Sequence, residues 1–328
     1  MKYLGGLFLV VLLLASCATG WEGEERDFRQ DMRDFVMGIH QYAETKKPGF
    51  IIIPQNGHEL LTLVKGNPAG TAADTYIAAI DGVGREDLFY GYDGDDKPTA
   101  AEDTDAMVAY MDLAEGRGVE VLATDYCSTH TKMTDSYNKN AARGYISFAA
   151  DSRELDTIPD FPSEPFGKNT ANVTTLAEAK NFLYLINPSE YSTKTAFLQA
   201  AGGTDYDLVI MDLFDIAGEA LTPTDLAAMR QKDGGGTRLL ICYMSIGEAE
   251  DYRYYWQDSW NRDQPEWIAA ENPAWKGNYK VEYWNTDWQA IIYGSTAAYL
   301  DRIIAAGFDG VYLDIIDAYE FFEEALGL

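Results

Sequence analysis

Acidic and amide side chains follow nearly every apolar, strand-like segment of this chain. A single carboxylate in such a place is more often a helix cap or an ion-pair partner than a functional group. The carboxyl ends of parallel strands meet at one face of an α/β domain, so side chains that end many strands would share one cavity. The candidate site residues, which also include one serine, are Gln55, Asn56, Glu86, Asp87, Asp125, Asp151, Asn187, Asp212, Asp215, Ser245, Glu248, Asp314 and Asp317.

Carboxylates without a histidine or thiol nucleophile are suited to cleavage of a glycosidic bond. One acid protonates the leaving oxygen while a partner carboxylate attacks carbon or activates water. The three histidines, His40, His58 and His130, are not clustered at ligand spacing, so we expect no zinc or copper site and no cofactor. Oxygen-rich sites also bind calcium or magnesium, which leaves a metal-dependent hydrolase as an alternative.

A segment rich in tryptophan and tyrosine lies between the last two strand-like runs, from Asp251 to Gln289. Aromatic faces stack on the apolar faces of sugar rings and on cations. We expect Trp256 and Trp284 to contact substrate from this loop. Trp288 stands at the head of a predicted helix, and we expect it to pack against the body of the protein instead.

The alternation of strand-like and helix-like segments predicts the fold that would position these side chains. An amphipathic helix is expected over residues 27–46, and β-branched or aromatic runs then alternate with Ala- and Leu-rich stretches, the last of which is expected to be one helix from Asp287 to Gly307. This pattern predicts a closed (β/α)8 TIM barrel, with a doubly wound open sheet as the alternative. No glycine-rich phosphate motif follows the first run, which disfavours the open sheet. The expected strands are residues 49–56, 80–86, 119–126, 144–151, 181–188, 207–215, 238–248 and 309–317.

The first residues have the pattern of an export signal, with Lys2 followed by an apolar run and small residues. The tetrapeptide Leu14-Ala15-Ser16-Cys17 has the form of a bacterial lipobox. We expect a lipoprotein signal peptide at 1–16, lipidation of Cys17, an anchor and linker over 17–25 and a single barrel domain over 26–328. The protein would then be exported and held at the cell envelope, facing the periplasm or the exterior. An ordinary cleaved secretory signal is the alternative.

The net charge indicates which ligands the protein could bind, and the cysteines indicate whether a disulfide is expected. A formal net charge of −28 argues against a nucleic-acid ligand and would attract cationic ligands, although acidity also keeps an exported protein soluble. Cys127 and Cys242 lie in apolar strand-like runs, and we expect two small buried residues and not a disulfide.

Three stretches of the carboxyl half make the chain similar to a known family. They read ICYMSIGEAEDYRYYW, ENPAWKGNYKVEYW and GFDGVYLDIIDAYEFF, and they resemble the bacterial branch of the endo-α-1,4-polygalactosaminidase family, glycoside hydrolase family 114. Members of this branch often carry a cysteinyl-tRNA synthetase-related label, for which this chain has no nucleotide-binding signature. The resemblance covers Asn181 to Phe322. It implies a (β/α)8 barrel that cleaves α-1,4-linked galactosamine polymers with a pair of carboxylates.

The resemblance also implies which carboxylates form that pair. The family's aspartate-containing strand motif corresponds to Gly310–Asp314, so Asp314 is the counterpart of one catalytic acid. Fungal members place the second acid on a later strand, which implies that this chain is circularly permuted and that Glu86 is the partner. We expect substrate contacts from Asp125, Asp212, Glu248, Asp317, Asn187, Tyr243, Trp256 and Trp284.

The acidic strand ends and the resemblance together predict an exported, endo-acting hydrolase of a cationic amino-sugar polysaccharide, held at a membrane only by its lipid anchor. Glu248 adds an acid where the fungal branch has a shorter turn. It would bind a substrate ammonium, orient a catalytic partner or cap the loop. A non-catalytic surface glycan-binding lipoprotein remains the alternative from another class of function.

Overall fold

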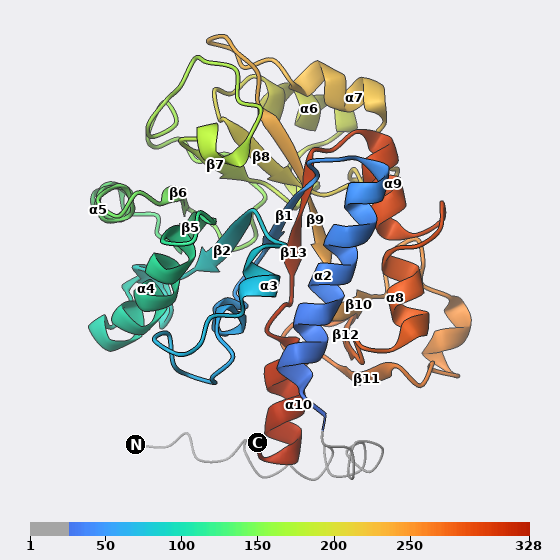
Figure 1. Ribbon diagram of the computed structural model, residues 1–328. Helices are drawn as coiled ribbons and strands as arrows, with labels where there is room; N and C mark the ends of the chain where they lie inside the picture. The colour runs from blue at the N-terminus through green and yellow to red at the C-terminus, as the bar shows by residue number, and fades with distance from the viewer. Residues whose placement is uncertain (1–25) are drawn as a thin grey trace, which may run out of the picture.

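All eight runs that we expected as strands form strands of parallel sheets (Figure 1). The computed structural model describes residues 26–328, and the expected signal peptide, the lipidation site Cys17 and the linker to Glu25 lie outside them. The strand side chains are buried almost throughout, as in parallel sheets that are covered on both faces. The strands are β1 (Ile51–Pro54), β2 (Gly82–Glu86), β5 (Glu120–Tyr126), β6 (Ile146–Ala150), β7 (Phe182–Tyr184), β8 (Leu208–Met211), β9 (Leu239–Ser245) and β13 (Gly310–Asp314).

The parallel strands neighbour one another in chain order. One ladder runs β1-β13-β9-β8-β7 and a second runs β2-β5-β6. An isolated parallel bridge between Gln55 and Gly84 joins the end of β1 to β2. Between β6 and β7 the rings of Phe148 and Phe182 pack 5.8 Å apart, but no ladder joins these two strands within residues 26–328. The structure is therefore a mixed α/β fold with parallel sheets, whose ladder is interrupted between β6 and β7.

Helices lie on the outside of these strands (Figure 1). The helix expected over residues 27–46 forms as α2 (Phe28–Lys46), and Asp27 caps it by accepting a hydrogen bond from the amide of Gln30 at 2.9 Å. Thr222 and Asp225 form a reciprocal capping box at the start of α7 (Pro223–Met229). The other helices are α3 (Asp74–Ile77), α4 (Ala101–Glu115), α5 (His130–Ala141), α6 (Lys194–Gly202), α8 (Thr286–Ile292), α9 (Tyr299–Ala306) and α10 (Ala318–Leu326), with short 3-10 turns η2 (His58–Leu61), η3 (Leu176–Glu178), η4 (Pro188–Glu190) and η5 (Asp258–Asn261).

The single helix expected from Asp287 to Gly307 is wrong, because the chain forms α8 and α9 there instead. α8 ends at Ile292, and Gly294 then adopts a φ of 113°. Glycine enters this backbone region without the steric penalty of other residues, so it provides a natural break. Apolar periodicity continued through the break because both helices bury one face against the same core.

The first and last segments of the described chain pack against each other. α2 runs alongside β1 and β13 and next to α9 and α10 (Figure 1). Phe28 stacks on Phe322 of α10 with ring centroids 5.5 Å apart, and Arg29 donates a hydrogen bond to Glu323 at 2.6 Å. α2 therefore covers the side on which strands from the two ends of the chain are paired. Within residues 26–328 no helix is long and apolar enough to cross a membrane.

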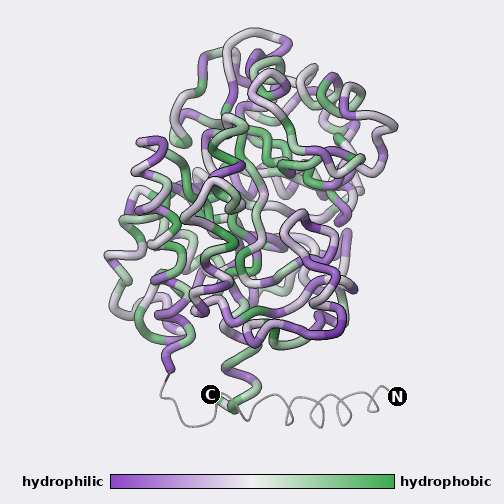
Figure 2. The backbone as a smooth tube through the Cα atoms, turned by 90° about the vertical axis from the view of Figure 1, so that its right-hand side faces the viewer, coloured by the Kyte–Doolittle hydropathy of each residue, from purple (hydrophilic) through white to green (hydrophobic). Residues whose placement is uncertain are grey.

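Two small antiparallel sheets are inserted after strands of the parallel sheets. Between β9 and α8 the chain forms β10 (Glu248–Glu250), β11 (Ile268–Glu271) and β12 (Asn278–Val281), with β12 in the middle, and after β2 it forms a hairpin of β3 (Tyr90–Gly91) and β4 (Gly94–Pro98). Figure 2 shows the hydrophobic segments concentrated in the interior, with hydrophilic loops around them. Cys127 and Cys242 are buried in that interior and free, as expected.

Candidate active site

A cavity of about 810 Å³ lies where the parallel strands end. Most of these strands contribute the residue at their carboxyl end or one just beyond it, and the inserted sheet of β10 and β12 closes one side. The candidate residues that the structure brings together here are Gln55, Asn56, Glu86, Asn187, Asp212, Asp215, Tyr243, Glu248, Asp314 and Asp317.

Asp314 ends β13 and lies at the wall of this cavity. Its Oδ2 accepts a hydrogen bond from the hydroxyl of Tyr243 at 2.6 Å, and its Oδ1 accepts one from the amide of Ile315 at 2.8 Å. Burial, together with the negative charge of Glu86, nevertheless raises the pKa of Asp314 to about 7. Near neutral pH this carboxyl is therefore able both to hold and to release a proton.

Glu86 ends β2 and faces the same cavity. Its Oε2 accepts a hydrogen bond from Asn56 Nδ2 at 2.9 Å, and its Oε1 accepts one from the hydroxyl of Tyr126. The amide of Glu86 donates back to Asn56 Oδ1 at 3.1 Å, so the carboxylate and its backbone are held by the same neighbour. Burial raises the pKa of Glu86, although the donated hydrogen bonds act in the opposite direction.

The backbone enters the left-handed region just beyond the ends of β1, β2 and β13. Asn56, Asp87 and Ile315 have φ values of 59°, 59° and 58°, in the left-handed region. For the β-branched Ile315 this conformation is unfavourable, and such strain costs on the order of 1–3 kcal/mol where the surroundings enforce it. Asp87 and Ile315 directly follow Glu86 and Asp314, so the unusual backbone lies next to both carboxylates.

A buried guanidinium joins two further acids of the cavity. Arg253 Nη1 pairs with Asp212 Oδ2 at 2.7 Å, and Arg253 Nε pairs with Glu250 Oε2 at 2.6 Å. Asp212 follows β8 and Glu250 lies on β10, so this arginine connects the inserted sheet to the parallel strands. Burial raises the pKa of Asp212, and Arg253 counteracts that rise.

A second cation lies on the other side of the cavity. Arg153 Nη2 donates to Asp87 Oδ1 at 2.9 Å, and its guanidinium lies 3.8 Å from the ring centroid of Tyr126. Tyr126 in turn donates to Glu86, so Arg153 supports the position of that carboxylate through the ring. Arg153 and Arg253 were not predicted as site residues, because their partners Asp87 and Asp212 lie far away in the chain.

Glu248 and Asp317 form the part of the wall next to Asp314. Glu248 is fully buried, and its Oε1 is contacted by Lys280 Nζ at 2.7 Å and Asn272 Nδ2 at 2.8 Å. Burial raises the pKa of Asp317, against which the charge of Lys280 acts. Asn187 also lines the cavity, and its Oδ1 accepts a hydrogen bond from the amide of Ser189 at 3.2 Å.

The structure does not bring Asp125 to the cavity. Its carboxylate is fully buried and accepts hydrogen bonds from the amides of Phe89 and Tyr90 at 2.8 and 3.1 Å and from Ser136 Oγ at 2.6 Å. Successive side chains of a strand point to opposite faces, so Tyr126 faces the cavity while Asp125 faces the covering helix α5. In place of the expected substrate contact, Asp125 holds the loop after β2.

Both tryptophans that were expected to contact substrate pack elsewhere. Trp256 stacks on Tyr279, with ring centroids 4.9 Å apart, inside an aromatic cluster of the inserted sheet. Trp284 lies against Phe322 at 4.7 Å, beneath the start of α2. Trp288 is fully buried and donates from Nε1 to the carbonyl of Ile246 at 2.9 Å, as expected of a packing residue.

Other aromatic side chains of the same segment do reach the cavity. Trp275 and Tyr252 line it and are 54% and 63% exposed, which is unusual for side chains of this size. Composition identified the aromatic segment, but contacts between distant residues decide which of its rings remain open to a ligand.

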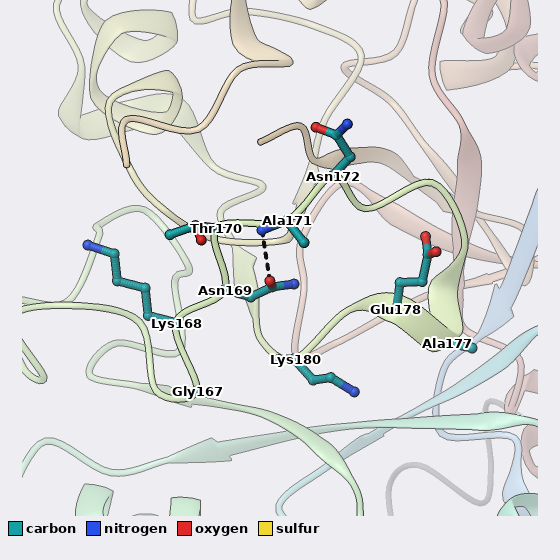
Figure 3. A pocket seen from close by; sticks show the side chains of 9 residues that line it. All are labelled: Gly167, Lys168, Asn169, Thr170, Ala171, Asn172, Ala177, Glu178 and Lys180. Carbon is teal, nitrogen blue, oxygen red and sulfur yellow. Dashed lines mark hydrogen bonds between the residues drawn. The ribbon is translucent and has the colours of Figure 1, made fainter. Parts of the chain in front are cut away.

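An open crevice lies before the start of β7, at the opposite end of the strands (Figure 3). Asn169 Oδ1 accepts a hydrogen bond there from the amide of Ala171 at 2.9 Å, and the side chains of Lys168 and Lys180 point apart. No pair of carboxylates faces this crevice, so the strand-end cavity remains the candidate active site. Across residues 26–328, no three or more His, Cys, Asp or Glu side chains are grouped so that they could hold a metal ion.

Curated relatives match parts of the chain. An uncharacterized protein of Methanocaldococcus jannaschii is 35% identical over 182 residues, which are 55% of this chain and 49% of that protein. An uncharacterized protein of Deinococcus radiodurans is 47% identical over 38% of this chain and 37% of its own length. An uncharacterized protein of Thermotoga maritima is 49% identical over 26% of this chain and 25% of its own length. The matched segments thus span about half or less of the length of these relatives.

A family model identifies the carboxyl-terminal half. The model of glycoside-hydrolase family GH114 matches residues 168–328, which include Tyr243, Glu248 and Asp314, whereas Glu86 lies outside the match. The resemblance drawn from the three sequence stretches is confirmed by this match. Residues 168–328 of the chain are therefore assigned to glycoside hydrolase family 114.

Proposed function

We propose that the protein is an endo-acting glycoside hydrolase in which Asp314 and Glu86 form the catalytic carboxylate pair. The observation that carries this proposal is the meeting of the two acids in one cavity, where the charge of Glu86 helps to raise the pKa of Asp314 to about 7. Two coupled carboxyls of this kind hold one proton between them over a range of pH. Membership of a glycoside hydrolase family supports the same reaction class.

The pair meets the chemical requirements of glycosidic cleavage. One carboxyl has to be protonated to donate its proton to the leaving oxygen, and the other has to be ionised to attack the anomeric carbon or to activate water. Tyr243, Asn56 and Tyr126 donate hydrogen bonds that hold the two carboxyls in place. The side chains that orient the acids are thus neutral donors, which restrain geometry without fixing either acid in its charged form.

The proposed substrate is an α-1,4-linked galactosamine-type polysaccharide with free amino groups. Eight acidic side chains and two arginines line the cavity, so a cationic polymer would be attracted to it. Trp275 and Tyr252 at its rim offer open aromatic faces on which sugar rings can stack. The family resemblance supports this polymer class.

We also propose that the parallel strands form a (β/α)8 barrel that is circularly permuted relative to fungal family members. The order of the strands and the bridge between Gln55 and Gly84 support a barrel. The pairing of β1 with β13 and the bridge from Gln55 to Gly84 support permutation. Through them Glu86, from outside the family match, and Asp314, from within it, line one cavity.

The proposed location is the cell envelope, where acylated Cys17 would anchor an exported protein. The lipobox pattern of Leu14-Ala15-Ser16-Cys17 supports this proposal. Incorporation of a labelled fatty acid by the full chain, and its loss in Cys17→Ala, is the expected result. Equal labelling of the variant would contradict the anchor.

The function is tested by the release of reducing ends from α-1,4-linked galactosamine polymer. We expect Asp314→Asn and Glu86→Gln each to reduce kcat by roughly 10²–10⁴-fold, since each removes a proton donor or acceptor. Asp263→Asn, at an exposed position outside the cavity, is the matched control and should retain full activity. Full activity of Asp314→Asn would refute the assignment. Tight oligosaccharide binding without release of reducing ends would instead support the glycan-binding alternative.

A further inference from the structure

His58 lies beside the candidate active site, although the proposed reaction does not use it. It opens η2, two residues after Asn56, and is half-buried. Its Nδ1 lies 2.9 Å from the backbone carbonyl oxygen of Asn56 and 3.3 Å from Nη1 of Arg85. A carbonyl oxygen only accepts hydrogen bonds, so the shorter contact requires that Nδ1 carries a hydrogen and donates it. Partial burial, together with the positive charge of Arg85, lowers the pKa of His58 to about 4, so the ring is neutral near neutral pH.

The carbonyl that His58 contacts belongs to the residue that orients Glu86. Asn56 donates from Nδ2 to Glu86 Oε2 at 2.9 Å and accepts at Oδ1 from the amide of Glu86 at 3.1 Å. Asn56 has a φ of 59°, in the left-handed region, which asparagine adopts more readily than most residues but still at a cost. The hydrogen bond from His58 therefore stabilises the backbone conformation from which the Asn56 side chain reaches Glu86.

The same turn also packs against the chain beyond Asp314. Gly57 is buried, and a Cβ at this position would overlap the side chain of Ile316. Ile316 is fully buried and lies two residues after Asp314. Residues 55–58 thus contact the side chain of one acid of the pair and the segment that follows the other. A change in this turn would alter the positions of the two acids relative to each other.

We propose that His58 is a positioning residue, which fixes the turn of residues 55–58 and thereby holds Glu86 in place relative to Asp314. This inference rests on the proposed function and adds a residue that contacts neither the substrate nor the reacting atoms. A single hydrogen bond contributes little to stability by itself. A catalytic group that is displaced by about 1 Å can nevertheless slow a reaction by roughly 10²-fold, so a bond that fixes this turn matters for catalysis.

The first test compares two substitutions of His58 by the release of reducing ends from α-1,4-linked galactosamine polymer. His58→Phe retains a ring that packs edge-on against Tyr110, as His58 does at 5.1 Å, but removes the N–H, and we expect kcat/KM to fall roughly 10–100-fold. His58→Asn places an amide N–H near the position of Nδ1, and we expect kcat/KM within about fivefold of wild type. His130→Phe, at an exposed position where the ring stacks on Phe161, is the matched control and should retain full activity.

The pH profile distinguishes positioning from a general loss of structure. The charge of Glu86 raises the pKa of Asp314, so Glu86 is the acid of the pair that ionises first. Loss of the hydrogen bond from Asn56 should raise the lower apparent pKa of the pair, and a larger separation of the two acids should lower the upper one. The bell-shaped profile of kcat/KM should therefore narrow from both sides in His58→Phe and regain its width in His58→Asn.

A smaller amount of folded enzyme would instead lower the whole profile without changing its width. Neither variant removes the other charged and titratable groups that interact with the two acids, which are Arg85, Asp87, Tyr126, Arg153, Tyr184, Tyr243, Tyr312 and Asp317. A profile of unchanged width in His58→Phe, or equal losses of activity in His58→Phe and His58→Asn, would overturn the role of His58 and leave the hydrolase proposal intact. An inactive wild type would overturn both.

The second test needs no variant of His58. Nitrogen NMR of wild-type protein with labelled histidine should show the hydrogen of His58 on Nδ1 near neutral pH, with the signals of the other two histidines assigned through His40→Gln and His130→Phe. A hydrogen on Nε2 would overturn the proposal even if His58→Phe does not fold, because Nδ1 would then accept a hydrogen bond from Arg85 and donate none to Asn56.

Discussion

Two groups of acids in the cavity are held in different ways. Asp212 and Glu250 are paired with the guanidinium of Arg253, whereas Asp314 and Glu86 form no ion pair with a basic side chain within residues 26–328 and accept hydrogen bonds from neutral groups. Arg253 opposes the protonation of Asp212, whereas neutral donors leave a buried acid freer to take up a proton. We infer that Asp212 and Glu250 maintain the structure, whereas Asp314 and Glu86 are available for proton transfer.

The largest expected effect follows from removal of the cation in the first group. Arg253→Met leaves Asp212 and Glu250 close together without their shared partner, and breaking a buried ion pair costs roughly 3–5 kcal/mol. We expect the free energy of unfolding, measured in urea, to fall by about that amount. Arg143→Met, which breaks an exposed pair with Asp112, is the matched control and should cost at most about 1 kcal/mol. Equal effects of the two variants would show that Arg253 is not a structural connection.

For the second group we expect the opposite change in stability, because removing Asp314 should stabilise the protein at high pH. The pKa of Asp314 is raised to about 7 in the folded protein, so the folded state holds a proton that the unfolded chain releases from about pH 4 upward. The contribution of Asp314 to wild-type stability should therefore decline as pH rises from about 4 to 7 and stay lower above that window. Asp314→Asn removes this loss and is expected to be more stable than wild type at pH 8, by about 1–3 kcal/mol after allowance for solvent screening.

This stability difference is measured from thermal unfolding at both ends of the pH window. At pH 4 the wild-type carboxyl is protonated in the folded state, so the two proteins should have nearly equal Tm values. Asp263→Asn controls for the loss of a negative charge at an exposed position. A lower stability of Asp314→Asn than of wild type at pH 8 would contradict the prediction. It would mean that substitution destabilises the protein in both groups of acids.

The strands of the fold were predictable from the sequence, because buried parallel strands are apolar along their whole length. Residues 239–244, from Leu239 to Met244, show this clearly. The ends of the strands were predictable for the same reason, and with them Asp314 and Glu86. The interruption of the ladder between β6 and β7 was not predictable, because apolar runs do not encode which strands share a hydrogen-bonded ladder.

The sequence predicted those site residues whose position depends on neighbours in the chain, but not those whose position depends on contacts with distant segments. Asp125 was misplaced because the sequence shows that a strand ends there but not which face of β5 is turned to the cavity. Trp256 and Trp284 were misplaced because their packing partners lie on distant segments. The link from Arg253 to Asp212 joins residues 41 positions apart, and only the folded chain brings them into contact.

The smallest expected effect tests how a neutral donor influences the pKa of the acid that it contacts. Tyr243 donates its hydroxyl hydrogen to Asp314 Oδ2 at 2.6 Å, which favours the ionised form of that carboxyl. Tyr243→Phe removes this donor, so the pKa of Asp314 should rise further, by up to about one unit. The limb of the kcat/KM profile that reports Asp314 should move to higher pH by the same amount. Tyr279→Phe, outside the cavity, should leave the profile in place. A shift to lower pH in Tyr243→Phe would mean that the hydroxyl accepts from a protonated Asp314 instead, and that the proton of the pair resides there in the resting enzyme.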